Sequence, residues 1–119
     1  MSFRRNKVQD AIRDELSAML TKDLSDPRLE FASVTAVELS SDMSFAKVFI
    51  SSFRKDPEAA KSAAEALEAA KGRIRGEIGR RLGIRHSPEL NFRPDHSMER
   101  AAKVLEILND IKAGTEDRS

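Results

Sequence analysis

The 119-residue chain contains no cysteine, no tryptophan and no tyrosine, and all six of its aromatic residues are phenylalanine. Without cysteine there can be no disulfide, no thiolate metal site and no cysteine nucleophile. No stretch approaches the roughly 20 apolar residues of a membrane span, and no apolar segment follows the basic N-terminus. We therefore expect a soluble cytoplasmic protein that does not contact a membrane.

Patterns typical of catalytic and metal sites are also scarce. His86 and His96 are the only histidines, and their separation, with a predicted strand between them, is not a metal-ligand spacing. No serine lies in a Gly-x-Ser-x-Gly setting, and there is no P-loop and no dinucleotide-binding Gly-x-Gly-x-x-Gly. Asp95 and Glu99 are typical of a helix N-terminus rather than a catalytic pair. We predict a non-enzyme that needs no metal, no cofactor and no small-molecule substrate.

Charge is concentrated in one region, although the net charge is only +1. Between Lys71 and Arg93 seven basic residues stand against Glu77 and Glu89, and residues 1–7 carry Arg4, Arg5 and Lys7 with no acid. A locally basic segment in a nearly neutral chain indicates a face that binds a polyanion. Charge alone fits equally well a solvated helix whose charges pair with acids elsewhere.

Hydrophobic periodicity predicts four helical regions and three strands. The first helix covers about 7–24, with Val8, Ile12, Leu16 and Leu20 on one buried stripe, and ends at Asp26-Pro27. Strands at 33–39 and 45–53 form a hairpin, and Phe45, Phe49 and Phe53 are expected in the core. Asp56-Pro57 begins an alanine-rich helix that Gly72 divides or kinks and Leu82-Gly83 ends. A short strand at 90–93 precedes a last helix at about 97–111, whose stripe comprises Ala101, Val104, Leu105, Leu108 and Ile111.

The first six elements have the order α-β-β-α-α-β of a type II KH domain. We predict an α+β fold in which a small three-stranded sheet is covered by helices and a C-terminal helix follows. KH domains bind single-stranded nucleic acid through a Gly-x-x-Gly loop between paired helices, and no such loop is present at this junction. Residues 1–113 are expected to form one RNA-binding domain, and residues 114–119 a disordered tail.

Four of the five glycines are Gly72, Gly76, Gly79 and Gly83. On a helix they fall within a sector about 60° wide, away from the apolar positions, and we call them the glycine stripe. Each glycine inside a helix lowers its stability by about 1 kcal/mol relative to alanine. A stripe of glycines therefore needs an explanation. One explanation is that an RNA backbone approaches the helix closely while neighbouring arginines bind its phosphates. The other is close packing of a protein element.

Short motifs along almost the whole chain resemble the ribosome-binding factor A family, which assists bacterial small-subunit assembly and cold adaptation. The matching segments are Asp26–Leu29, Val37–Ser40, Asp42, Ala46–Val48, Ala70–Gly72, Ile74–Arg75, Leu82–Arg85, Pro88–Phe92 and Asp95–Ser97. Their order and spacing together carry the resemblance. The chain departs from the family in its very short C-terminal tail and in the extra glycines Gly76 and Gly79.

This resemblance implies a type II KH-like fold in which an Ala-x-Gly kink, here Ala70-Lys71-Gly72, replaces the Gly-x-x-Gly loop. It also implies transient binding of a monomer to the immature 30S subunit and to 16S rRNA, with a role in rRNA processing and late assembly and no catalysis. From the basic stretch and the glycine stripe we predict RNA contacts at two groups of residues. The first group is Lys71, Gly72, Arg73, Arg75, Arg80, Arg81 and Arg85. The second is a mobile basic arm of Arg4, Arg5 and Lys7. Two alternatives remain. One is a regulatory KH-like module for other nucleic acids, and the other is a protein–protein adaptor that does not bind RNA.

Overall fold

The computed structural model describes residues 3–54 and 56–116. Its elements follow the predicted order, with a short 3₁₀ helix added. They are α1 (Phe3–Lys22), η1 (Pro27–Leu29), β1 (Ala32–Leu39), β2 (Phe45–Ser52), α2 (Ala59–Ala69), α3 (Lys71–Leu82), β3 (Glu89–Pro94) and α4 (Ser97–Glu116). The α+β class and the three-stranded sheet are thereby confirmed.

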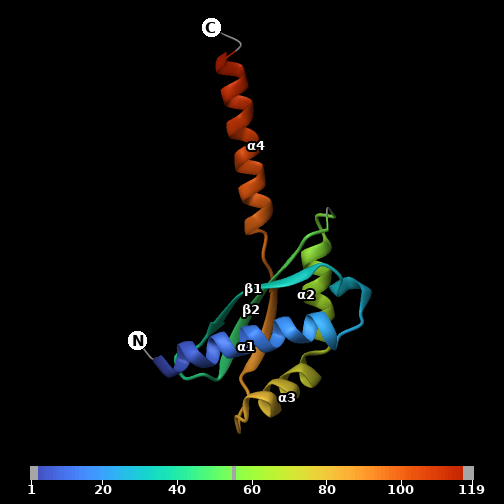
Figure 1. Cartoon of the computed structure of the whole chain (residues 1–119), viewed down its shortest axis with the longest axis vertical. Helices are drawn as coiled ribbons and strands as arrows, with labels where there is room; N and C mark the ends of the chain where they lie inside the picture. The colour runs from blue at the N-terminus through green and yellow to red at the C-terminus, as the bar shows by residue number, and fades with distance from the viewer. Residues whose placement is uncertain (1–2, 55, 117–119) are drawn as a thin grey trace.

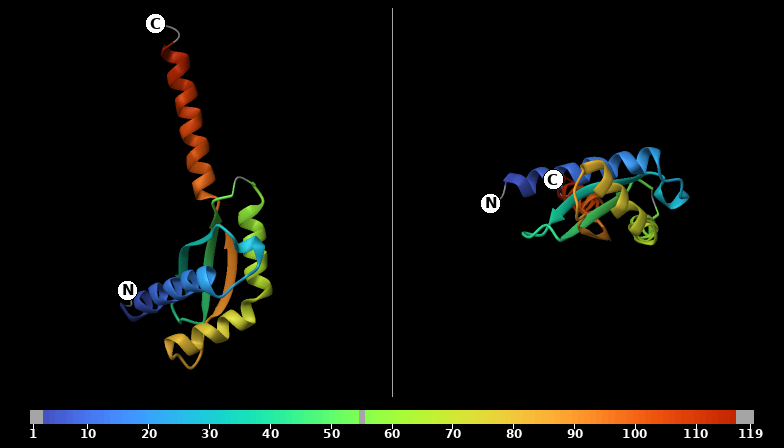
Figure 2. Two further views of the ribbon diagram at one scale, coloured as in Figure 1. Left: turned by 45° about the vertical axis from the view of Figure 1, so that its right-hand side comes forward. Right: turned by 90° about the horizontal axis from the view of Figure 1, so that it is seen from below.

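The sheet has the order β1-β2-β3, with β2 in the middle. Strands β1 and β2 pair antiparallel as the predicted hairpin, and β3 pairs parallel to β2, with Ala46 opposite Leu90 and Val48 opposite Phe92. The parallel pair requires a long crossover, which α2 and α3 provide. Figures 1 and 2 show α1, α2 and α3 on one side of the sheet, so the other face is left without a helix.

The core lies between this helical layer and the inner face of the sheet. Ile12 and Leu16 of α1 are 0% and 2% exposed, and Ile74 and Ile78 of α3 are both 0% exposed. The buried alanines of α2 present little side-chain bulk to β2 and β3, on which the helix packs. Each fully buried Leu or Ile stabilises the fold by about 1.5–3 kcal/mol, so the predicted apolar stripes supply the packing that holds α1 and α3.

Several predicted boundaries shift for local reasons. Helix α1 begins at Phe3 and ends at Lys22. Asp26, the predicted end of this helix, instead caps η1 by accepting a 2.9 Å hydrogen bond from the Arg28 amide. Helix α2 begins two residues beyond the predicted Asp56-Pro57 start. The Asp56 side chain accepts from the amide of Glu58 at 2.9 Å, and its carbonyl accepts from the amide of Ala59 at 3.0 Å, which forms a turn before the helix.

The prediction that three phenylalanines of the second strand lie in the core was wrong. Ala46, Val48 and Ile50 are the residues of β2 that point to the helices and are fully buried. Because side chains alternate along a strand, Phe45 and Phe49 lie on the helix-free face and are only half-buried. Phe53 lies beyond the end of β2 and is 63% exposed.

Helix α4 projects away from the rest of the molecule (Figure 1). The apolar stripe predicted for this helix is present but exposed, with Val104, Leu105, Leu108 and Ile111 between 54% and 61% exposed. The helix continues beyond its predicted end near Ile111, through Gly114 to Glu116. A single helical glycine costs only about 1 kcal/mol, which does not end the helix, and residues 117–119 lie outside the described residues.

Candidate nucleic-acid interface

The basic stretch of the sequence forms α3 and the loop that follows it. Helices α2 and α3 part at Ala70, whose backbone leaves the helical region at φ −101° and ψ 6°. Helix α3 ends at Gly83, which adopts the left-handed φ of 64° and donates from its amide to the carbonyl of Arg80. The chain then turns sharply into the loop 84–87 and returns toward β3, so this loop lies beside the helix that precedes it.

One side of α3 is the glycine stripe, and it faces open space. A Cβ atom built on Gly72 or Gly76 would meet no atom within 4 Å, and one on Gly79 would meet Ser87 Cβ at 3.5 Å and the Ile84 carbonyl at 3.6 Å, ordinary contact distances. Gly72, Gly76 and Gly79 of the stripe form one wall of a hollow of 520 Å³, the glycine hollow, whose other wall is the loop 84–87. Close packing by another described part of the chain therefore does not explain Gly72 or Gly76.

Arginine side chains border the glycine hollow. The Arg75 guanidinium donates two hydrogen bonds to the carbonyl of Ser87, at 2.9 and 3.1 Å, and so holds the loop against the helix. Arg80 and Arg85 also line the hollow, together with His86. Arg85 and His86 are both exposed. The hollow thus combines bare backbone with cationic and imidazole donors.

A second hollow of 350 Å³ lies on the other side of the same loop, and we call it the N-terminal hollow. It is lined by Arg4 and Val8 from the first turns of α1, by Met43 of the hairpin turn, and by Ile84, Arg85 and His86 of the loop, with Gly83 and Pro88 beside them. The fold therefore brings Arg4 and Arg85, which are far apart in the sequence, to one hollow. We call the surface of Arg4, Arg75, Arg80, Arg85 and His86 around these two hollows the basic face.

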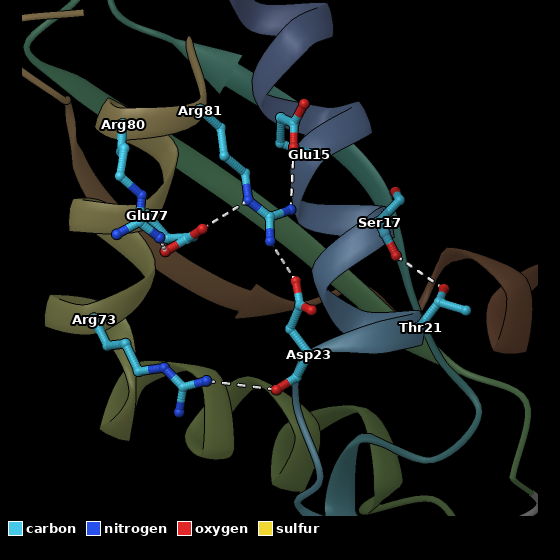
Figure 3. A network of polar contacts seen from close by, with 8 residues as sticks. All are labelled: Glu15, Ser17, Thr21, Asp23, Arg73, Glu77, Arg80 and Arg81. Atoms are coloured by element: carbon cyan, nitrogen blue, oxygen red, sulfur yellow. Dashed lines mark hydrogen bonds and ion pairs between the residues drawn. The ribbon is translucent and has the colours of Figure 1, made fainter. Parts of the chain in front are cut away.

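Arg81 does not belong to the basic face, because its side chain points toward α1 (Figure 3). Its guanidinium pairs with Glu15 at 3.2 Å, with Glu77 at 2.9 Å and with Asp23, and only 28% of its side chain is exposed. Hydrogen bonds to Glu77, Asp23 and Glu15 raise the pKa of Arg81. Three carboxylates surround this cation, so it ties α3 to α1 and is poorly placed to attract phosphate.

The other predicted RNA contacts of α3 lie partly near Arg81 and partly beside the glycine hollow. Arg73 lies near Arg81 and donates a long 3.5 Å hydrogen bond to the Asp23 carbonyl, and Arg80 pairs with Glu77, although 75% of its side chain is exposed. Lys71 pairs with Glu68 at 3.0 Å. Hydrogen bonds from Arg80 and then Arg81 lower the pKa of the Glu77 carboxyl. The predicted cations of α3 thus lie on two sides of the helix rather than on one.

The prediction that the basic arm is mobile was wrong, because its residues belong to the first turns of a regular helix, α1. Arg4 lines the N-terminal hollow, whereas the Lys7 ammonium lies 5.3 Å from the centroid of the Phe3 ring. Arg5 is half-buried on the same turn of the helix. Helix α1 therefore fixes the position of these residues. Arg4 is the one that lies in the same hollow as Arg85.

Sequence reasoning did not assign to the site six residues that line the hollows, namely Val8, Met43, Ile84, His86, Ser87 and Pro88. Met43, with a positive φ of 61°, brings the hairpin turn to the N-terminal hollow. His86 lines both hollows. Ser87 anchors Arg75 through its carbonyl, and its hydroxyl oxygen has no hydrogen-bond partner among the described residues. The turn motif Ser40-Ser41-Asp42 was a signal for the hairpin, but nothing in the sequence indicated that the turn lies beside residues 84–87.

Two findings limit the chemistry of the described residues. Within 3–54 and 56–116 no group of three or more histidine, cysteine or acidic side chains is arranged to hold a metal ion. In the same part of the chain no helix has the length and apolar character needed to cross a membrane. The basic face and its two hollows therefore present cationic side chains, bare helix backbone and apolar side chains to a ligand.

A family model described as Ribosome-binding factor A matches residues 4–108. The chain belongs to this family. A ribosome-binding factor A from Caldicellulosiruptor bescii is 42% identical, over 100% of this chain and 92% of that protein. The matched residues include both hollows and most of α4, so the basic face lies within the family's shared region.

Solved structures of ribosome-binding factor A share this fold. A solution structure from Thermotoga maritima, described as a putative member, has 33% sequence identity and a TM-score of 0.65, covering 78% of this chain and 88% of that one. A Thermus thermophilus ribosome-binding factor A, a homology model fitted into a cryo-EM map of a 30S complex, has 31% identity and a TM-score of 0.58, covering 82% of this chain and 97% of that one. These similarities confirm the predicted family and the KH-like fold.

Proposed function

We propose that this chain is a non-catalytic maturation factor that binds the immature 30S subunit through 16S rRNA. It acts as a monomer in the cytoplasm, assists rRNA processing and late assembly, and contributes to growth in the cold. It uses no cofactor and no small-molecule substrate. Membership of the ribosome-binding factor A family and the 30S complex of the Thermus thermophilus relative support the proposal.

The observation that carries the proposal is the basic face itself. Two basic segments that are far apart in the sequence, represented by Arg4 and Arg85, line one hollow, and the exposed glycine stripe adjoins it. A polyanion with a regular spacing of charges is the ligand that such a surface attracts. Bare helix backbone at Gly72 and Gly76 permits an RNA strand to approach closely while the arginines contact its phosphates.

Phosphate contacts supply affinity without reading the base sequence. On this account, specificity arises from the shape of the rRNA and from neighbouring ribosomal proteins rather than from a Gly-x-x-Gly loop. Lys71, Gly72, Arg73 and the arm residues Arg5 and Lys7 remain secondary contacts in the proposal. Arg81 acts mainly within the domain because three carboxylates surround it.

The test is co-sedimentation of the purified chain with purified 30S subunits at several salt concentrations. Arg4→Glu with Arg85→Glu should abolish binding, because both cations of the N-terminal hollow become anions. Arg54→Glu with Lys61→Glu, which makes the same charge change at exposed positions outside both hollows, should bind like the wild type. Arg85→Ala should reduce the slope of log affinity against log salt by about 1.

Two outcomes would favour the alternatives. If the wild-type chain retains its partner after the RNA is digested with nuclease, a protein–protein adaptor is indicated. If it binds a particular messenger RNA or DNA sequence far more tightly than 30S subunits, a regulatory KH-like module is indicated. Equal loss in the two double variants would show that total charge, rather than the basic face, determines binding.

A further inference from the structure

The N-terminal hollow differs in character from the glycine hollow. Its walls are apolar, formed by Val8, Met43, Ile84 and the buried Pro88, and its cations stand at the rim. Phosphates need no apolar wall, so contact with an RNA backbone does not account for this part of the surface. The hollow also lies at the C-terminal end of α3, whereas the helix junction at Ala70 lies at the other end.

We propose that the N-terminal hollow holds a single unstacked nucleobase of the rRNA, with the flanking phosphates on Arg4 and Arg85. This inference rests on the proposed function and names the part of the RNA that the site accepts. An unpaired base offers a flat apolar surface and polar edges, which suits apolar walls with guanidinium and imidazole groups at the rim. A base within a duplex cannot enter, so the site selects a single-stranded or bulged nucleotide.

The hollow is held open before any ligand binds. The hairpin turn that presents Met43 is fixed by the Asp42 carboxylate, which accepts hydrogen bonds from the hydroxyls of Ser40 and Ser44 and from the Ser44 amide, at 2.7 to 3.1 Å. On the opposite side, Arg75 fixes the loop 84–87 through the Ser87 carbonyl. A preformed hollow loses little conformational freedom on binding, as is usual for sites that recognise small rigid groups.

Charge complementarity favours a nucleotide over an apolar protein side chain. Arg85 is exposed at the rim with His86, and Arg4 approaches from α1. Among the residues that the structure describes, none that lines this hollow is acidic. An apolar side chain of a ribosomal protein would fill the walls but leave the rim cations without a counter-charge, whereas a nucleotide satisfies both.

A matched pair of substitutions at Val8 tests the proposal with the full-length chain and purified 30S subunits. Val8→Phe fills the hollow without changing charge, and Val8→Ala disturbs the packing of the same residue but leaves the hollow open. Val8→Phe should weaken binding roughly 10-fold, because the base can no longer enter the hollow, with an unchanged salt slope. Val8→Ala should bind within roughly 3-fold of wild type, which corresponds to about half that free-energy change at most.

The results separate this proposal from the proposed function. If wild type and Val8→Phe bind 30S subunits equally tightly, the nucleobase site is refuted and the proposed function stands. If wild type itself does not bind, the proposed function fails and the nucleobase site fails with it. If Val8→Phe loses affinity for 30S subunits but not for protein-free 16S rRNA, the hollow receives a ribosomal protein and the proposal is overturned.

A spectroscopic measurement locates the base directly. The chain has only four methionines, so ¹³C-methyl labelling of methionine gives a simple spectrum. On saturation with a single-stranded RNA hexaadenylate, the ring current of a bound base should shift the Met43 methyl signal, while Met19, 1% exposed in the core, should stay unchanged. The same phosphodiester hexamer with abasic sugars should leave Met43 unchanged. Equal Met43 shifts with both ligands, or none with the hexaadenylate, would refute the site.

Discussion

Gly76→Ala should make the folded domain more stable. Gly76 lies in the middle of α3, is exposed, and has open space where a Cβ would project. Alanine is favoured over glycine inside a helix by about 1 kcal/mol, and nothing in the structure offsets this gain. For a domain of this size we expect the unfolding midpoint to rise by about 3–5 °C. The chain has no tryptophan or tyrosine, so unfolding is followed by far-UV circular dichroism.

Gly83→Ala is the matched control, because it makes the same chemical change in the same stripe. Gly83 has a left-handed φ of 64° at the C-terminus of α3. An L-residue with a Cβ is strained there by about 1–2 kcal/mol, so this substitution should lower the free energy of unfolding. The reasoning is refuted if Gly76→Ala destabilises the domain, since that result would mean that the stripe packs against another part of the protein.

The same variant separates stability from binding. If the stripe contacts RNA, Gly76→Ala should weaken 30S binding although the domain is more stable, because the added methyl group stands between helix backbone and ligand. Residues that lower the stability of the fold but allow contact with a ligand are expected at a functional site. Unchanged 30S affinity in a stabilised Gly76→Ala variant would remove the stripe from the interface while leaving Arg4 and Arg85 in it.

Three further predictions concern the rest of the domain. A chain ended after His96 should unfold within a few degrees of the full chain, because α4 projects from the body and its apolar stripe is exposed; a large fall in the midpoint would contradict this. Arg81→Met should lower the urea midpoint more than Arg80→Met, since Arg81 joins α3 to α1 whereas Arg80 pairs within α3. Hydrogen bonds from Ser44 and then Ser40 lower the pKa of Asp42 from 3.8 to about 2. Its contribution to stability is therefore complete above pH 3.8 and is lost as the pH falls toward 2, and Asp42→Asn should flatten this part of the stability curve; an unchanged curve would refute the role of the carboxylate.

Much of the fold could be predicted because local patterns decide it. The four-residue repeat of Ile12 and Leu16, the polar turn before Phe45 and the left-handed glycine after Leu82 each fix an element without distant information. The face of β2 could not be assigned in the same way. Both alternating sets of that strand are apolar, and only the arrangement of the helices decides that Ala46, rather than Phe45, is buried.

The candidate site was predictable in composition but not in arrangement. Charge counting found both basic segments, yet only the folded chain brings Arg4 to Arg85. Counting also cannot distinguish a cation that faces solvent from one that three carboxylates surround, as they do Arg81. The acid Glu15 comes from α1 and Asp23 from the turn just after it, so their pairing with α3 depends on how α1 and α3 pack.

The most direct test of the account is the position of the chain in a sucrose gradient of cell extract. We expect the wild-type protein to travel with free small subunits, and Arg4→Glu with Arg85→Glu to remain at the top of the gradient with unbound protein. Both proteins should give the same circular dichroism spectrum, which excludes misfolding. Wild-type protein that travels with 70S ribosomes or stays at the top, or a double variant that still travels with small subunits, would contradict the account.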